Sequence, residues 1–293
     1  NTSNNNVGIG KSAMGGYSGS GSSYNFTCTN NVAVGVDSLK VVTSGGYNIA
    51  IGSETSKHTT TGTGNIAIGY QSMLGSGTSG VHNYNTALGY YSLRGVSTGS
   101  SNTAIGTTAG FSLSSGGSNT LLGKDTGRSA TNLSNLVAIG DSALYTTNDT
   151  GANGSVAIGV SALAALTSGS ENTAIGYQSM KNATTAEYNV ALGYNTLGGS
   201  ASTAHTGNSN TAIGTYALAD MNDNGTQNTA VGNQALEEVT NGKYNTAVGA
   251  YAGDVITTGE YNTYLGYYAL GTSATEKYAV KIGSYGIKKF KTA

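Results

Sequence analysis

Short apolar segments recur along the whole chain, each flanked by polar residues and closed by a glycine. In residues 155–159 (SVAIG), Val156 and Ile158 would project to one face of an extended segment and Ala157 to the other. This alternation has a period of two, and the surrounding Asn, Ser, Thr and Gly disfavour a helix interior. Each segment therefore predicts a short β-strand that ends in a glycine turn, and a second short strand is expected just after it.

The segments are copies of one repeat, N-[TV]-A-[IVL]-G-x-x-[AS]-[LM], with good copies at residues 172–180 and 210–218. The closing glycines stand at positions 10, 35, 52, 69, 89, 106, 123, 140, 159, 176, 193, 214, 232, 249, 266 and 283. Ten of the fifteen intervals between them share one length and none is shorter, so extra residues are added as loops. The pattern predicts an all-β fold, a parallel β-roll (β-solenoid) of about 16 coils with a 17-residue period. Its repeat positions include Gly69, Gly106, Gly176, Gly214, Gly249, Ile175, Asn172 and Asn245.

Asparagine opens thirteen of the copies, so stacked coils would place one Asn above the next. Their amides can then form a hydrogen-bonded ladder and satisfy backbone groups of the turns. The alternative is a flat Thr and Asn surface that orders water, as an ice-binding protein would. Val7, Val32 and Val137 interrupt the Thr column, however, which indicates a core or an interface.

A 17-residue coil encloses little space, so only one face of each strand can point inward. Whether Ala or the Val/Thr and Ile positions face inward is left open, and in both cases an apolar column remains to be covered. We expect copies of the chain to associate along this column and to form a homotrimer. Ile175 and Val248 should lie on one such column, and Asp in place of Ile175 should break assembly or folding by placing a charge in a core.

Composition narrows the function classes. The net charge of −1 excludes a generally basic nucleic-acid surface, and a single Cys excludes a disulfide framework and a Cys-based zinc site. No apolar run is long enough for a membrane span. Carboxylates cluster only at residues 220–225 and 237–238, without the ligand spacing of a calcium loop. We expect no metal, no cofactor and no enzymatic activity.

The repeat resembles the head repeat of trimeric autotransporter adhesins, the YadA-like β-roll, and also arrays found in tail fibres of bacterial viruses. The resemblance rests on the copy at residues 155–159 and its N-T-A-I-G relatives, and it covers nearly the entire chain. It implies a trimeric structural fibre or adhesin in an extracellular or virion location. Adhesin heads use shorter coils, and no stalk or membrane anchor follows position 293 in this sequence, which favours a fibre segment of a phage or a secreted filament.

Receptor contacts are expected in the longer intervals and on the tyrosines. The intervals hold Tyr17, Tyr24, Phe26, His82 and His205, and these are the candidate receptor-binding residues. Tyr also recurs just after the closing glycine and just before the Asn, where it can cover the neighbouring coil or stack on sugar rings. The expected partners are further copies of the chain and a glycan or protein receptor on a host surface.

The last residues depart from the repeat. The array proper spans residues 1–276, and residues 277–293 are a decayed repeat with five Lys that would form a basic C-terminal cap. The function predicted from all these features is a trimeric β-roll shaft that displays loops for receptor or surface binding. The alternative is a purely structural subunit of a self-assembling filament.

Overall fold

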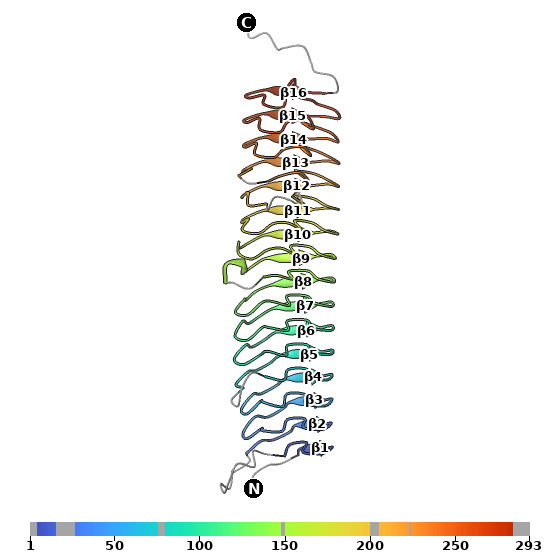
Figure 1. Cartoon of the computed structure of the whole chain (residues 1–293), viewed down its shortest axis with the longest axis vertical. Helices are drawn as coiled ribbons and strands as arrows, with labels where there is room; N and C mark the ends of the chain where they lie inside the picture. The colour runs from blue at the N-terminus through green and yellow to red at the C-terminus, as the bar shows by residue number, and fades with distance from the viewer. Residues whose placement is uncertain are drawn as a thin grey trace. The chain divides into compact units, whose positions relative to one another are not determined.

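The computed structural model describes residues 5–15, 27–75, 80–147, 150–199, 205–222 and 224–283. Within these ranges the chain forms sixteen three-residue strands and one short 3-10 helix (Figure 1). The first eight strands are β1 (Val7–Ile9), β2 (Val32–Val34), β3 (Ile49–Ile51), β4 (Ile66–Ile68), β5 (Thr86–Leu88), β6 (Thr103–Ile105), β7 (Thr120–Leu122) and β8 (Val137–Ile139). After η1 (Thr150–Ala152) follow β9 (Val156–Ile158), β10 (Thr173–Ile175), β11 (Val190–Leu192), β12 (Thr211–Ile213), β13 (Thr229–Val231), β14 (Thr246–Val248), β15 (Thr263–Leu265) and β16 (Val280–Ile282).

The chain divides into two compact units, Asn1–Thr150 and Gly151–Ala293, which we call unit 1 and unit 2. In unit 1 strands β1 to β8 pair in parallel in chain order, and in unit 2 strands β9 to β16 do the same. Equivalent repeat positions are paired, as in Thr173 with Val190 and Ile175 with Leu192. The predicted all-β parallel β-solenoid with a 17-residue period is confirmed.

The central residue of every strand from β2 to β15 points inward. Ala174 is fully buried, whereas its neighbours Thr173 and Ile175 are only half-buried on the outer face of β10. The expectation that Asp at position 175 would put a charge in a core is therefore wrong for the single chain. The physical reason is the narrow interior, which holds the central side chain of the strand, Ala in most coils, and leaves the two flanking side chains outside.

The expected second strand of each coil does not form among the described residues, and turns take its place. In the coil of Gly89, the second and fourth residues after the glycine, Tyr91 and Leu93, have φ values of 58° and 48°. The N–H of Ser92 donates to the carbonyl oxygen of Gly89 at 3.4 Å and closes the first turn. This left-handed backbone reverses the chain within a few residues and buries Leu93 completely. A strand could not turn so sharply.

In the coils of β6 and β7, one large side chain at the centre of β7 takes the space that a large side chain at the fourth position after the glycine fills in most coils. Most coils combine Ala at the strand centre with Leu or Met at the fourth residue after the glycine. In β7 the centre is Leu121, and the fourth position is glycine in its own coil (Gly127) and in the preceding one (Gly110). A Cβ on Gly110 would lie 2.9 Å from Leu121 Cδ1, and one on Gly127 would lie 3.1 Å from Leu121 Cδ2. The glycines thus leave the space that Leu121 fills.

The Asn column forms a buried ladder in each unit. Asn102 Nδ2 donates to Asn85 Oδ1 at 3.0 Å and to the Gly116 carbonyl oxygen at 2.9 Å. Its own Oδ1 accepts from the backbone N–H and the Nδ2 of Asn119. Each such amide therefore satisfies the coil before it and the coil after it. Leu136 takes the column position in β8's coil and Ser155 in β9's.

Candidate functional site

The repeat positions named from the sequence fall at equivalent places in successive coils. Gly176 and Gly249 have φ values of 137° and 134°, in the region that favours glycine. A Cβ on Gly176 would also collide with the carbonyl oxygen of Gly193 in the next coil. Gly69, Gly106 and Gly214 share this geometry, and Asn172 and Asn245 stand in the buried ladder of unit 2.

The expectation that His82 and His205 contact a receptor is wrong, because both side chains are 0% exposed. His82 Nε2 lies 3.0 Å from Thr59 Oγ1, and Gly80 pairs with Thr59 as an isolated bridge. His205 pairs in the same manner with Ala183. When positions are counted back from the closing glycine that follows each His, both residues fall within the regular coil and outside the inserted loop. Of the other candidates, Tyr17, Tyr24 and Phe26 lie outside the described residues.

His82 is expected to make unit 1 sensitive to acid. Burial lowers its pKa from 6.5 to about 4, and Nδ1 has no hydrogen-bond partner among the described residues. The unfolded chain binds a proton below about pH 6.5 and the folded chain does not until about pH 4, so stability falls as the pH falls between these values. We expect a loss of about 3 kcal/mol in the free energy of unfolding from this group.

The prediction is checked by denaturant unfolding of the parent and of His82→Leu between pH 7 and pH 4. Leu133 stands seven residues before its closing glycine, as His82 does, so a Leu is compatible with this inward position. The variant should lose less stability on acidification than the parent. Identical pH profiles would contradict the assignment.

The outward tyrosines stack on one another. Tyr244 and Tyr261 have ring centroids 4.7 Å apart and planes 6° apart, and Tyr278 continues the stack at 5.1 Å and 4°. Tyr177 and Tyr194, just after their closing glycines, stack at 5.5 Å and 4°. Neighbouring rings therefore cover each other's faces and present edges and hydroxyl groups to solvent. This favours the interpretation that they cover adjacent coils over stacking on sugar rings.

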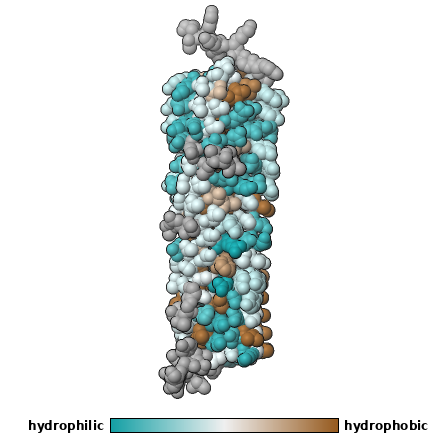
Figure 2. Space-filling view, in the orientation of Figure 1, coloured by the Kyte–Doolittle hydropathy of each residue, from teal (hydrophilic) through white to brown (hydrophobic). Residues whose placement is uncertain are grey.

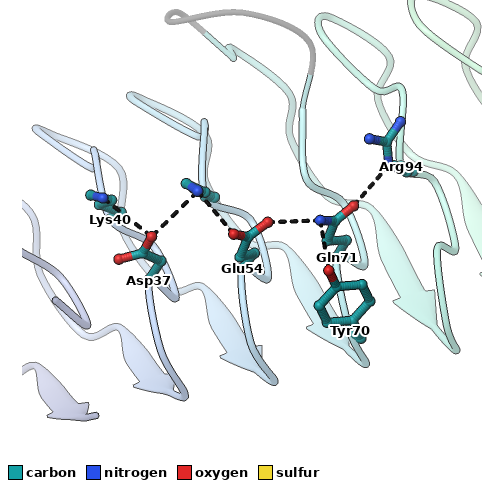
Figure 3. Close-up of polar contacts among 7 residues, drawn as sticks. Asp37, Lys40, Glu54, Tyr70, Gln71 and Arg94 are labelled. Atoms are coloured by element: carbon teal, nitrogen blue, oxygen red, sulfur yellow. Dashed lines mark hydrogen bonds and ion pairs between the residues drawn. The ribbon is translucent and has the colours of Figure 1, made fainter. Parts of the chain in front are cut away.

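A charged ladder runs across the turns of unit 1, at the second and fifth positions after the glycines (Figure 3). Asp37 pairs with Lys40 at 3.2 Å and with Lys57 at 3.3 Å, and Lys57 also reaches Glu54 at 3.1 Å. Gln71 Nε2 donates to Glu54 Oε2 at 2.7 Å. Burial would raise the pKa of Asp37, but its hydrogen bonds and charge interactions with the two lysines outweigh this and lower it. The ladder follows from the 17-residue repeat, which places the same turn positions above one another.

Beyond Gln71 the ladder becomes a row of alternating arginine and aromatic side chains. Arg94 lies 5.4 Å from the ring centroids of both Tyr91 and Phe111. Arg128 lies 5.6 Å from Phe111 and 5.9 Å from Tyr145. We call these five residues the arginine stripe. Sequence reasoning missed it, although positions 94, 111, 128 and 145 are visibly one repeat apart.

Unit 2 carries acidic residues at comparable turn positions. Burial, together with the charges of Glu237 and Glu238, raises the pKa of Asp254 to about 6. The pKa of Glu237 is also raised, first by burial. In the described part of the chain no group of three or more His, Cys, Asp or Glu residues is placed to hold a metal ion.

The decayed repeat continues the coil for some residues. Strand β16 still pairs with β15, Lys277 forms an ion pair with Glu260 at 2.9 Å, and Lys281 forms one with Glu276 at 3.2 Å. Lys288, Lys289 and Lys291 lie outside the described residues. The two described lysines of the expected basic cap are therefore compensated by carboxylates.

The outer face of the strands is apolar. Its two positions per strand hold only Thr, Val, Ile and Leu in the sixteen described strands. Ile51, Leu88 and Leu192 are 38%, 42% and 44% exposed. Figure 2 shows apolar side chains recurring along one margin of the unit 1 surface. We call this surface the outer strand face; contiguous exposed apolar surface of this kind marks interaction sites.

Comparison with known proteins adds no relative. No family model, no curated protein and no solved structure matches this chain. Among the residues that the structure describes, no helix is long and apolar enough to cross a membrane.

Proposed function

We propose that this chain is the shaft of an extracellular or virion-borne fibre, and that its copies associate laterally through the outer strand face. The observation that carries the proposal is the apolar face itself, which leaves Ile and Leu side chains about 40% exposed coil after coil. A protein that worked as a single chain would expose this surface permanently. The closed homotrimer expected from the resemblance to autotransporter heads and tail fibres would cover it without open ends.

A shaft role also suits the interior. Most coils bury Ala at the strand centre and a few larger aliphatic side chains in the turns, and they connect to their neighbours by a parallel ladder and an Asn ladder. Each coil contacts only its neighbours, so the stability of the stack grows by repetition. The function is accordingly mechanical and adhesive, with no chemical step. Surface binding in this proposal rests on the faces of the coils, because His82 and His205 are buried.

Ile175→Asp is expected to abolish lateral association while leaving the single chain folded. Ile175 is half-buried on the outer strand face, so the charge stays hydrated in one chain and becomes buried only in an interface. Desolvating an unpaired carboxylate should weaken association by at least a hundredfold. Size-exclusion chromatography with light scattering measures the mass, and circular dichroism checks the fold.

The matched control is Thr185→Asp, which adds the same charge at an exposed turn near β10 and away from the strand face. It should remain a trimer. A parent that stays monomeric at all concentrations would contradict lateral association. Concentration-dependent polymers in place of a discrete trimer would favour the filament subunit.

A further inference from the structure

Arg94 is a charged group held in place without a carboxylate partner in the described part of the chain. Lys40, Lys57, Lys124 and Arg128 all pair with Asp37, Glu54 or Asp125. Arg94 instead donates from Nε to Gln71 Oε1 at 3.0 Å. A guanidinium has five N–H donors, so its two terminal amino groups remain able to bind an anion. Their planar arrangement matches a carboxylate or a phosphate.

The arginine stripe fixes this guanidinium before any ligand arrives. Tyr91 and Phe111 flank Arg94 at equal distances of 5.4 Å, and Gln71 orients its Nε edge. A side chain ordered in advance loses little conformational entropy on binding. The exposed Tyr90 adds a phenol hydroxyl next to Tyr91. These contacts hold the guanidinium in a fixed orientation, and all five residues of the stripe lie in unit 1.

The spacing of the cations indicates what kind of anion fits. Arg94 and Arg128 occupy the same turn position two coils apart, with uncharged Phe111 between them. At about 4.8 Å per coil the two guanidinium groups are separated by roughly 10 Å along the stack. A nucleic-acid strand carries a phosphate about every 3.4 Å, so it is far more densely charged than the stripe.

We propose that the arginine stripe binds an acidic polysaccharide whose carboxylates lie on alternate sugars. A hexose is roughly as long as one coil spacing, so a carboxylate on every second sugar falls opposite Arg94 and then opposite Arg128 and Lys124, two cations that share the single carboxylate of Asp125. The carboxylate accepts hydrogen bonds from the terminal amino groups of Arg94, and the polymer runs along the stack. The binding is reversible and involves no covalent step. This inference goes beyond the proposed shaft function and does not require lateral association.

The test uses the full chain and immobilised hyaluronan, a linear polymer with a carboxylate on alternate sugars. We expect salt-sensitive binding by the parent and a loss of about tenfold or more in affinity for Arg94→Gln, because charge-assisted hydrogen bonds are removed. Lys181→Gln is the matched control, since Lys181 occupies the same turn position in unit 2. It should bind as the parent does. Arg94→Gln should keep the parent's melting temperature.

Three outcomes would overturn the proposal. They are parent binding to neutral dextran as tight as to hyaluronan, no binding of the parent to hyaluronan, and equal affinities for the parent and Arg94→Gln. Tighter binding to a DNA oligonucleotide or to phosphatidylglycerol vesicles than to hyaluronan would replace the polysaccharide with a phosphate ligand. Each result is independent of the oligomeric state, so failure here is distinguishable from failure of the shaft function.

Discussion

Replacing Asn102 with Leu should lower the free energy of unfolding of unit 1 by about 5 kcal/mol. The substitution leaves the Gly116 carbonyl oxygen and the backbone N–H of Asn119 without their partner, and Asn119 Nδ2 keeps only its hydrogen bond to the Leu133 carbonyl oxygen. All three groups are buried where water cannot replace the amide. Each of the two unsatisfied groups costs about 1–3 kcal/mol and the third lost hydrogen bond about 1 kcal/mol, and the losses occur together. Urea unfolding followed by circular dichroism measures the effect.

Two further variants make this prediction specific to the ladder. Asn132→Leu removes an exposed Asn of unit 1 whose Oδ1 accepts only from serine hydroxyl groups, and it should change stability by less than about 1 kcal/mol. Asn102→Ser should cost less than Asn102→Leu, because Ser155 holds the equivalent position and its Oγ accepts from the N–H of Asn172. Equal losses for the Leu and Ser variants would show that the amide ladder is not what stabilises the coils.

Leu121→Ala should destabilise unit 1 by about 4 kcal/mol. Large-to-small substitutions cost most where the surroundings cannot collapse into the cavity, and here Gly110 and Gly127 have no side chain to move. Gly110→Leu alone should also destabilise the fold, because its Cβ would already lie 2.9 Å from the methyl groups of Leu121 and Leu93. Both effects are measured as free energies of unfolding.

The double variant Leu121→Ala/Gly110→Leu should recover most of the stability that either change removes. It recreates the ordinary coil, with Ala at the strand centre and Leu at the fourth position after the glycine, where Leu93 has a φ of 48°. The favourable coupling follows because the two residues share one volume. Additive losses in the double variant would disprove the exchange of volume. Leu122→Ala, on the half-buried outer face of β7, is the control and should cost much less than Leu121→Ala.

The repeat alone determined the architecture. A regularly spaced glycine, a period-two apolar segment before it and an Asn that opens it sufficed to predict a parallel β-solenoid and its Asn ladder. These features are local or repeated, and repetition averages out the uncertainty of any single copy. The same argument predicted that extra residues are added between coils.

Which side of each strand faces inward was decided only by the tertiary structure. The alternation of Val156, Ala157 and Ile158 is compatible with either orientation, and the cross-section of the coil selects Ala157. Backbone closure likewise replaced the expected second strand with left-handed turns such as that of Leu93. It also placed His82 inside, because its position is set by the glycine that follows and not by the insertion that precedes it.

The contacts within the arginine stripe were likewise decided by the tertiary structure, although the one-repeat spacing of its members can be seen in the sequence. Arg94, Phe111 and Arg128 are each one repeat apart in sequence, and nothing local marks them as neighbours. Stacking of the coils places the Phe111 ring between the guanidinium groups of Arg94 and Arg128, so rings and guanidinium groups alternate. The sequence determined which coil positions repeat. The closure and stacking of the coils decided which side chains are buried, which meet on the surface, and which carry a charge that a ligand can reach.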